Sequence, residues 1–448
     1  MDGPRDVPPQ GAPRPRVPHR TPRNPGVLAG ALRGFEGTRA QCSQAGADRI
    51  GALRHAAAPN RGREVSHPLK GLILCAGRGT RLHPLTHTTP KALMPVVNRP
   101  VLSYLLEDLQ QAGVTEVGIV VNGETSPIVD FLSSDPVPGL RTEFLVQSDP
   151  KGLAEAVGLG RVFTAEEPFV VCLGDCFAPG GVQQLVHAHL GTRPEATVAL
   201  HTVSHPSSFG IVEMADGRIR RFWEKPASPR SDMAVVGLYA FEPTIYRVLE
   251  RVGPSWRNEY ELTDALQALV DLGFAVEGWM LPGHWQDIGR PADVLAANTY
   301  QLGRLQWSMK GTLRRCRVEG TVAVGEGTVL ESTVLQGPVA VGRRCRIAAS
   351  HIGPYTCIGD DAQIERSELS GSVLMARCRL EDVRGLSTSL VGNDARLAAG
   401  VDAPLRLRLV VGDHCTVWVG EPRPPASAGP AVVTPASWLR TNGTGPGG

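Results

Sequence analysis

A short segment after the first apolar run of the chain carries two glycines and two cations. The run 72–74 is followed by Gly77 and Gly79, then by Arg81 and, after a polar stretch, by Lys91. A glycine turn at the end of a strand lets backbone N–H groups approach a phosphate. Arginine and lysine add charge-assisted hydrogen bonds to phosphate oxygens. Taken alone, the segment is equally typical of a phosphate site and of an ordinary turn with solvated surface cations.

Two common phosphate-binding glycine loops do not match this segment. A Walker loop needs the pattern GxxxxGK[ST], which is missing here. A dinucleotide-binding loop needs a third glycine where this chain has Leu82, and no helix is expected directly after it. What remains is a glycine turn with two separated cations, which suits the charge of a triphosphate.

The elements that must position this turn alternate between strands and helices from residue 69 onwards. Apolar runs predict strands at 69–77, 116–122, 169–175 and 197–203. Leucines at helical spacing and closing glycines predict helices at 100–113 and 256–273. Asp216-Gly217, between two strand-like runs, indicates a hairpin. This alternation predicts an α/β domain with a mainly parallel sheet over residues 67–305.

Beyond residue 310 the apolar pattern changes to a repeat of six. The repeat is carried by Val318 and Val324, by Val341 and Ile347 and, after a slip of one residue, by Ile352, Ile358 and Ile364. A hexapeptide repeat without helical periodicity predicts a short left-handed β-helix at 310–420, with one aliphatic side chain per face pointing inward. Cys345 and Cys357 are twelve residues apart, so we expect them to stack inside it.

The two ends of the chain differ in composition from the rest. Residues 1–66 contain nine Pro, eleven Arg, five acidic residues and no Lys, and we expect this leader to be disordered. A basic interaction tail, a transit peptide and a start further downstream are its alternative readings. The Pro/Gly/Ala-rich tail at 421–448 is expected to be flexible. Because the net charge of +2 depends on the leader, no nucleic-acid partner is expected.

Two further observations concern the compartment. No run reaches about 18 uninterrupted apolar residues, so we expect no membrane span. The nine cysteines are scattered without a CxxC pair, which is typical of a protein of the reducing cytoplasm.

The order of the motifs along the chain resembles that of a known family. The segment from Gly77 to Tyr104, GxGTRLxPLTxxxPKxLxPVxxxPVLxY, resembles the opening signature of the sugar-phosphate nucleotidylyltransferases. Further motifs follow in the family's order: QSDPKGLAEAV (147–157), LGDCF (173–177), FGIV (209–212), EKP (224–226), VVGLYAF (235–241), SWRNEYELTDAL (255–266) and GHWQDIG (283–289). The chain resembles most closely the long form of the glucose-1-phosphate thymidylyltransferases, which end in a short β-helix. The resemblance implies a Rossmann-like nucleotidyltransferase domain.

The resemblance also implies a reaction. In the family, the phosphate oxygen of a hexose 1-phosphate attacks the α-phosphorus of a nucleoside triphosphate in line with the leaving pyrophosphate. For this chain the implied substrates are dTTP and glucose 1-phosphate, and the products are dTDP-glucose and pyrophosphate. No covalent enzyme intermediate is needed, so catalysis depends on alignment and on neutralisation of charge. Mg²⁺ is the implied cofactor.

Residue roles follow from the positions that match the family's motifs. Arg81, Lys91, Asp175 and Asp287 are the implied catalytic residues, and the two aspartates are the implied metal ligands, since hard oxygen ligands suit Mg²⁺. The implied nucleotide site comprises Ala76, Gly77, Gly79, Thr80, Arg81, Lys91, Gln147, Gly152 and Leu153. The implied sugar-phosphate site comprises Gly210, Glu224, Lys225, Val235 and Trp285. Each of these residues could instead have a purely structural role. The aspartates could cap loops or helices, residues 152–157 could simply begin a helix, and residues 224–226 could be an exposed hairpin end.

Departures from the family's pattern and rival activities leave alternatives open. Cys176 occupies a place that is often Asn, and Phe209 stands where short forms tend to have Tyr. UTP, or GTP with mannose 1-phosphate, could replace dTTP. An acyltransferase on the β-helix with His351 as base, and a regulatory homologue with a dead site, are the remaining rivals. The flat faces of the β-helix leave room for a homo-oligomer.

Overall fold

The computed structural model describes residues 69–165, 167–215, 218–400, 402–404 and 406–420. The leader at 1–66, the hairpin tip at Asp216-Gly217 and the tail at 421–448 lie outside the described residues, so the predictions made for them stay predictions. Among the described residues, no helix is long and apolar enough to cross a membrane.

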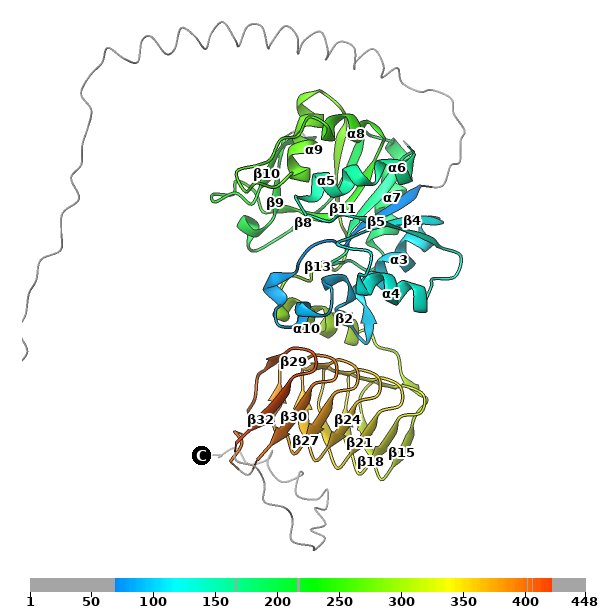
Figure 1. Ribbon diagram of the computed structural model, residues 1–448, viewed down its shortest axis with the longest axis vertical. Coiled ribbons are helices and arrows are strands. Elements are labelled where there is room, and N and C mark those ends of the chain that lie inside the picture. Colours follow the sequence, from blue (N-terminus) through cyan, green and yellow to red (C-terminus); the bar gives the residue numbers. More distant parts are fainter. Residues whose placement is uncertain (1–68, 166, 216–217, 401, 405, 421–448) are drawn as a thin grey trace, which may run out of the picture. The chain divides into compact units, whose positions relative to one another are not determined.

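A nine-stranded mixed sheet forms the centre of the first domain (Figure 1). Its strands are β1 (Lys70–Leu74), β4 (Glu116–Val121), β5 (Arg141–Val146), β6 (Phe169–Leu173), β8 (Ala196–Thr202), β9 (Gly210–Ala215), β10 (Arg218–Glu224), β11 (Met233–Phe241) and β12 (Val276–Met280). Strands β6, β1, β4 and β5 are neighbours in that order and run parallel, which confirms the expected Rossmann-like sheet. Strand β11 runs antiparallel to β6, β8 and β9. The two strands that flank the expected hairpin tip, β9 and β10, are antiparallel neighbours.

Helices pack on both faces of this sheet (Figure 1). One face carries α3 (Val101–Gln111), α4 (Pro127–Ser134) and α7 (Gly181–Thr192). The other carries α5 (Leu153–Leu159), α8 (Thr244–Leu249) and α9 (Leu262–Asp271), and α6 (Arg161–Thr164) follows α5. Helix α3 illustrates why the helices pack on the sheet. Its four leucines at helical spacing are buried, and burying each of them stabilises the fold by about 2 kcal/mol.

One predicted helix begins later than expected. The pattern at 256–273 predicted a helix throughout, but α9 begins at Leu262. Residues 255–261 form a loop, because Asn258 has a left-handed backbone with φ of 59° and its N–H closes a turn onto Ser255 O at 2.8 Å. The loop is also held from outside, since Tyr260 N donates to Lys151 O at 2.7 Å. This loop becomes part of the cavity described below.

The segment between β1 and α3 has its own small core. It consists of three 3-10 turns, η1 (Thr80–Leu82), η2 (Leu85–His87) and η3 (Lys91–Leu93), and the hairpin β2 (Pro95–Val96) and β3 (Arg99–Pro100). Its apolar side chains Leu82, Leu85, Met94 and Val96 are fully buried and pack with α10 (Pro291–Leu302). Nearby, β7 (Cys176–Phe177) pairs with β13 (Gln286–Asp287).

Three parallel sheets form the expected β-helix at the C-terminal side (Figure 1). The first sheet contains β14 (Ser308–Met309), β17 (Val322–Val324), β20 (Val339–Val341), β23 (Thr356–Ile358), β26 (Val373–Leu374), β29 (Leu390–Val391) and β31 (Val410–Val411). The second contains β15 (Thr312–Arg314), β18 (Val329–Glu331), β21 (Arg346–Ala348), β24 (Gln363–Glu365), β27 (Arg379–Glu381), β30 (Arg396–Ala399) and β32 (Thr416–Val419). The third contains β16 (Arg317–Glu319), β19 (Val334–Gln336), β22 (His351–Ile352), β25 (Glu368–Ser370) and β28 (Leu386–Ser387).

The one-residue slip in the repeat is a regular feature of the coils. Leu330, Ile347 and Ile364 lie opposite one another in register, so each of these coils has 17 residues. Two spacings of six and one of five fill a coil, and the short spacing falls between the second and third sheets. Hydroxyl side chains line that corner: Ser367 N donates to Ser350 Oγ at 3.1 Å.

The expected stack of Cys345 with Cys357 is wrong. Cys345 lies inside the β-helix, but Cys357 is the central residue of β23 and points outward, where it is fully buried against the first domain. A spacing of twelve assumes that both residues face inward, whereas the outward and inward positions alternate along a strand. Each of the eight cysteines in the described part of the chain is a free thiol.

Candidate active site

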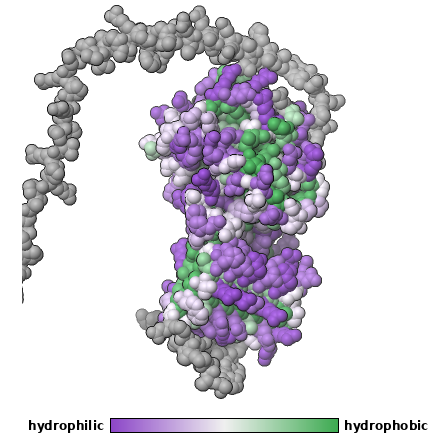
Figure 2. Space-filling view, viewed as in Figure 1, coloured by the Kyte–Doolittle hydropathy of each residue, from purple (hydrophilic) through white to green (hydrophobic). Residues whose placement is uncertain are grey.

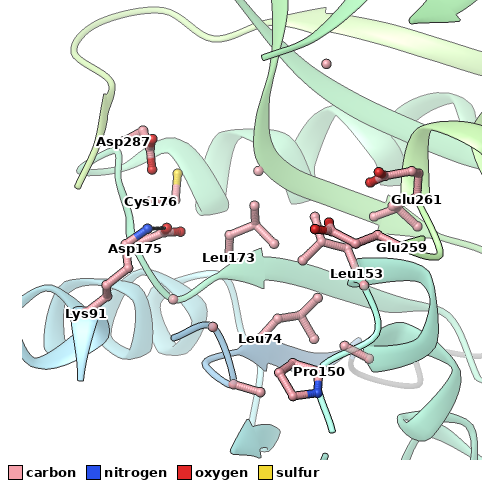
Figure 3. Close-up of a pocket in the computed structure, with 18 of the residues that line it drawn as sticks. Leu74, Lys91, Pro150, Leu153, Leu173, Asp175, Cys176, Glu259, Glu261 and Asp287 are labelled. Atoms are coloured by element: carbon pink, nitrogen blue, oxygen red, sulfur yellow. Dashed lines mark hydrogen bonds and ion pairs between the residues drawn. The ribbon is translucent and has the colours of Figure 1, made fainter. Parts of the chain in front are cut away.

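The residues singled out in the sequence line one cavity of about 700 Å³ in the first domain. They are Ala76, Gly77, Gly79, Thr80, Arg81, Lys91, Gln147, Gly152, Leu153, Asp175, Gly210, Glu224, Lys225, Val235, Trp285 and Asp287. Figure 3 shows Lys91, Asp175 and Asp287 at one side and Glu259 and Glu261 at the other, with leucines between them. The cavity opens at the carboxyl ends of β1 and β6, where ligands bind in parallel sheets.

Two aspartates far apart in the sequence meet at the first end of the cavity. Asp175 follows β6, and the pairing of β13 with β7 places Asp287 opposite Cys176. Ile288 N donates to Asp175 O at 2.9 Å, which fixes the register of the two segments. The carboxylates therefore face the same space (Figure 3).

Each aspartate has a cation beside it. Lys91 Nζ donates to Asp175 Oδ2, and Arg81 Nη2 lies 4.0 Å from Asp287 Oδ2. Burial alone would lower the pKa of Lys91, but the charges of Asp175 and Asp287 outweigh it and raise this pKa above its ordinary value. The lysine therefore stays charged within the cavity.

At this end of the cavity, the ionised form of Asp287 is disfavoured. Burial, and then the charge of Asp175, raise the pKa of Asp287 to about 7, although Lys91 and Arg81 act against the shift. A divalent cation between the two carboxylates would relieve their repulsion, so the residues present fit a hard cation. Within the described residues no cluster of three or more His, Cys, Asp and Glu could hold a metal ion. Further ligands would have to come from a substrate.

Gly79 has a steric role that the sequence does not show. Its φ of 62° is left-handed, and a Cβ there would lie 2.6 Å from Lys91 Cγ. Thr86 Oγ1 donates to Gly79 O at 2.7 Å. The glycine turn therefore packs against the stem of Lys91, whereas a Cβ on Gly77 would meet open space.

The amide of Gln147 has a defined orientation at the middle of the cavity. Gln147 is buried, and its Nε2 donates to Glu155 Oε2 at 2.9 Å and to Gly152 O at 3.4 Å. Both amide hydrogens are thus used within the protein, and Oε1 is left as an acceptor for a ligand. Gln147, which the sequence placed in the nucleotide site, can therefore offer a ligand an acceptor but no donor.

The far end of the cavity contains a network that the sequence reasoning missed. Arg257 Nη1 lies 3.1 Å from Glu261 Oε1 and 3.6 Å from Glu224 Oε1, and its Nη2 lies 3.0 Å from Glu259 Oε1. Thr263 Oγ1 donates to Glu224 Oε2 at 3.1 Å. Burial and the charge of Glu224 raise the pKa of Glu261. Because 256–273 was read as one helix, its first residues were not considered as cavity residues.

Two aromatic side chains and a thiol line the cavity between its two ends. Trp285 Nε1 and the Cys176 thiol both donate to Val236 O, at 3.1 and 3.2 Å. The ring of Phe209 packs edge-on against Trp285, with centroids 5.4 Å apart. Burial raises the pKa of Cys176 well above its ordinary value, so this thiol is an inert hydrogen-bond donor.

Comparisons with known proteins show which family the chain belongs to. A family model described as nucleotidyl transferase matches residues 70–303. The chain is 39% identical over 352 residues to a glucose-1-phosphate thymidylyltransferase of Streptomyces antibioticus, covering 78% of this chain and 99% of that protein. It is 35% identical over 352 residues to the low-salt glycan biosynthesis nucleotidyltransferase Agl11 of Haloferax volcanii, covering 77% and 99%.

A solved structure of UDP-glucose pyrophosphorylase complexed with UDP-glucose matches with a TM-score of 0.48 at 25% identity, covering 53% of this chain and 99% of that one. The family match and the relatives define the class of the protein as a nucleotidyltransferase. The chain belongs to the nucleotidyl transferase family, which confirms the resemblance seen in its motifs.

Proposed function

We propose that this protein transfers a thymidylyl group from dTTP to glucose 1-phosphate, giving dTDP-glucose and pyrophosphate. The observation that carries the proposal is the arrangement of one cavity. It has Arg81 and Lys91 at one end, the buried amide of Gln147 in the middle and the Glu224–Arg257 network at the other end. The Streptomyces antibioticus relative, which bears the name of this activity, aligns over 99% of its length.

The proposed reaction is a single displacement at phosphorus. An oxygen of the sugar phosphate forms a bond to the α-phosphorus, and the bond from that phosphorus to the oxygen bridging to the β-phosphorus breaks. Pyrophosphate leaves with the electron pair. Lys91 and Arg81 neutralise the charge that grows on the leaving group. Asp175 and Asp287 are the residues that would hold Mg²⁺, which would add to the neutralisation of the triphosphate charge.

The orientation of Gln147 supports a base with an N–H at the centre of its pairing edge. Thymine and uracil carry that N–H at N3, whereas cytosine and adenine present a lone pair that the Gln147 Oε1 acceptor would repel. UTP therefore fits this contact as well as dTTP and is the nearest alternative. GTP also carries such an N–H, and its larger base makes it the weaker candidate.

The network at the far end supports a sugar phosphate as the second substrate. Glu224 offers carboxylate oxygens to sugar hydroxyls, and Thr263 and Arg257 hold that carboxylate in place. Lys225 Nζ lies 3.2 Å from Glu224 Oε1 and adds a cation for the sugar phosphate.

Phosphorus NMR tests the proposal directly. dTTP, glucose 1-phosphate and Mg²⁺ are incubated with the protein, and the spectrum is expected to lose the triphosphate signals and gain those of a diphosphate diester and pyrophosphate. A mixture without glucose 1-phosphate is the control and should stay unchanged. Release of nucleoside diphosphate and inorganic phosphate instead would show hydrolysis and contradict the proposal.

A further inference from the structure

The first sheet of the β-helix differs from the second in its outward side chains. The outward positions of the first sheet, at Ala340, Cys357, Val373 and Leu390, are apolar and at most 4% exposed. The second sheet carries Arg346, Gln363, Arg379 and Arg396 at outward positions, all of them exposed. The strands of this second sheet are labelled β15, β18, β21, β24, β27, β30 and β32 in Figure 1, and they form a largely hydrophilic face in Figure 2. The first sheet is therefore built to pack against protein.

That packing partner is the segment that carries Arg81 and Lys91. The four apolar side chains of the first sheet belong to the same cluster as Leu82, Leu85, Met94 and Val96. Burial of apolar area fixes this contact but not its register, because the hydrophobic effect is non-directional. Register has to come from hydrogen bonds.

Asp413 supplies hydrogen bonds immediately before Lys91. Its Oδ2 accepts from Thr88 Oγ1 at 2.6 Å and from Thr89 Oγ1 at 3.0 Å. The carboxylate is itself fixed, since its Oδ1 accepts from Asn393 N at 2.7 Å. Thr89 precedes Lys91 by only two residues. We therefore expect a shift of the two threonines relative to Asp413 to move the lysine as well.

A second anchor follows Lys91. Asn98 Nδ2 donates to Ile358 O at 2.7 Å, and the Cys357 thiol donates to Asn98 Oδ1 at 2.9 Å. Lys91 thus lies between two points at which its segment is hydrogen-bonded to the β-helix. Lys91 Nζ in turn contacts Asp175.

We propose that the β-helix is a working part of the active site: Asp413 is a positioning residue that holds Thr88 and Thr89 and so aligns Lys91 with the triphosphate. The inference rests on the proposed function for what Lys91 does. An error of about 1 Å in the alignment of a reacting group is enough to cost a large factor in rate. The β-helix would therefore be needed for turnover.

The chain offers a matched control for Asp413. Asp360 follows the first sheet in the same way, as Ile358-Gly359-Asp360 against Val411-Gly412-Asp413. Its Oδ1 accepts from Arg343 N at 2.8 Å, the equivalent of the bond from Asn393 to Asp413. Its partners, Arg343 and Arg344, both belong to the β-helix.

The test compares kinetics of the full-length chain for dTTP and glucose 1-phosphate. Asp413→Ala is expected to lower kcat/KM for dTTP by about tenfold, mainly through kcat, because two hydrogen bonds are lost. Asp360→Ala is expected to stay within about twofold of wild type, since its bonds are confined to the β-helix. Asp413→Asn should restore part of the loss, because its amide still bonds a threonine hydroxyl.

The threonines complete the test if Asp413→Ala does not fold. Thr88→Val with Thr89→Val should reproduce the loss in kcat, and in a folded Asp413→Ala background the same pair should add nothing further. Equal losses in Asp413→Ala and Asp360→Ala, or full activity of the threonine pair, would overturn the proposal.

Hydrogen exchange separates this inference from the proposed function. Peptides covering residues 83–94 should exchange faster in Asp413→Ala, or in the threonine pair, than in Asp360→Ala, whatever the substrate is. A wild-type protein that turns over no triphosphate would count against the proposed function and leave this readout standing. Unchanged exchange of these peptides in Asp413→Ala and in the threonine pair would show that Asp413 does not hold the segment, and would overturn the proposal.

Discussion

Gly152 lies against the backbone of Tyr260, with no room for a side chain between them. Gly152 has φ of 131°, and a Cβ there would lie 2.5 Å from Tyr260 N. Tyr260 N donates to Lys151 O, and Ala154 N donates to Tyr260 O at 2.9 Å. The turn beside Gln147 and the loop that carries Arg257 are therefore joined by main-chain bonds. The ends of the cavity proposed for the nucleotide and for the sugar phosphate share this contact.

Gly152→Ala is expected to weaken the binding of both substrates together. The new Cβ must displace backbone, and alanine is strained at this φ, so both flanking segments move. We expect KM to rise several-fold, on the order of fivefold or more, for dTTP and for glucose 1-phosphate. Gly158→Ala, on α5, is the matched control, because its Cβ meets open space and the residue is not part of the cavity lining. A rise in one KM alone would contradict the shared contact.

Asp175→Asn and Asp287→Asn are each expected to remove metal-dependent turnover. Both substitutions keep the shape of the side chain and remove the negative charge that a divalent cation needs, so the loss should be at least about 100-fold. Circular dichroism and thermal unfolding should match wild type. Chelation with EDTA should have the same effect on wild type and be reversed by added Mg²⁺. Near-normal rates in either variant would show that the carboxylate is not a ligand.

Glu155→Ala is expected to reduce discrimination between dTTP and dCTP. Without Glu155 the amide of Gln147 loses its main acceptor and is free to turn, so it can offer a donor to cytosine. The ratio of kcat/KM values should fall by about tenfold, as expected when a polar contact no longer rejects the wrong partner. Gln147→Ala is expected to lower activity with both nucleotides and serves as the comparison. An unchanged ratio in Glu155→Ala would contradict the assigned orientation.

Asp108, on α3, is expected to make stability depend on pH. Burial raises its pKa to about 6 from an ordinary 3.8, although Gly180 N donates to its carboxylate at 2.7 Å. The folded state therefore holds the proton more tightly than the unfolded state. This contribution to the free energy of unfolding is complete below pH 4 and is lost as the pH rises to about 6.

Asp108→Asn should remove that dependence, because asparagine still accepts from Gly180 N and does not titrate. The variant is expected to be more stable than wild type at pH 7 by roughly 1–3 kcal/mol. Urea unfolding of both proteins at pH 4, 5, 6 and 7 measures the difference. A difference that does not change with pH would show that Asp108 has an ordinary pKa.

The sequence predicted the strands around the cavity well, because they are nearly continuous apolar runs. Asp175 follows such a strand, and its motif identified it without any structure. Its neighbour Asp287 was recognised only through the order of motifs, since nothing in its own spacing shows that β13 pairs with β7. Long-range pairing of two-residue strands leaves no pattern in the sequence.

The residues that were missed had a misleading local pattern. Arg257, Glu259 and Glu261 directly precede an amphipathic helix, with no Gly or Pro between them and it, so the sequence pattern predicts helix there as well. The signal against that reading was tertiary, in the bonds between Tyr260 and Lys151. The outward side of the first sheet, which packs against the segment of Arg81 and Lys91, could have been predicted from the sequence. Its apolar residues Ala340, Cys357, Val373 and Leu390 recur about once per coil.

The most direct test of the central claim is pyrophosphate release with dTTP, UTP, dCTP, GTP and ATP, each paired with a panel of hexose 1-phosphates and Mg²⁺. We expect the largest kcat/KM for dTTP with glucose 1-phosphate, lower values for UTP, and little release with dCTP or ATP. Asp175→Asn should release none. Turnover with GTP and mannose 1-phosphate alone, or no release with either dTTP or UTP, would contradict the account.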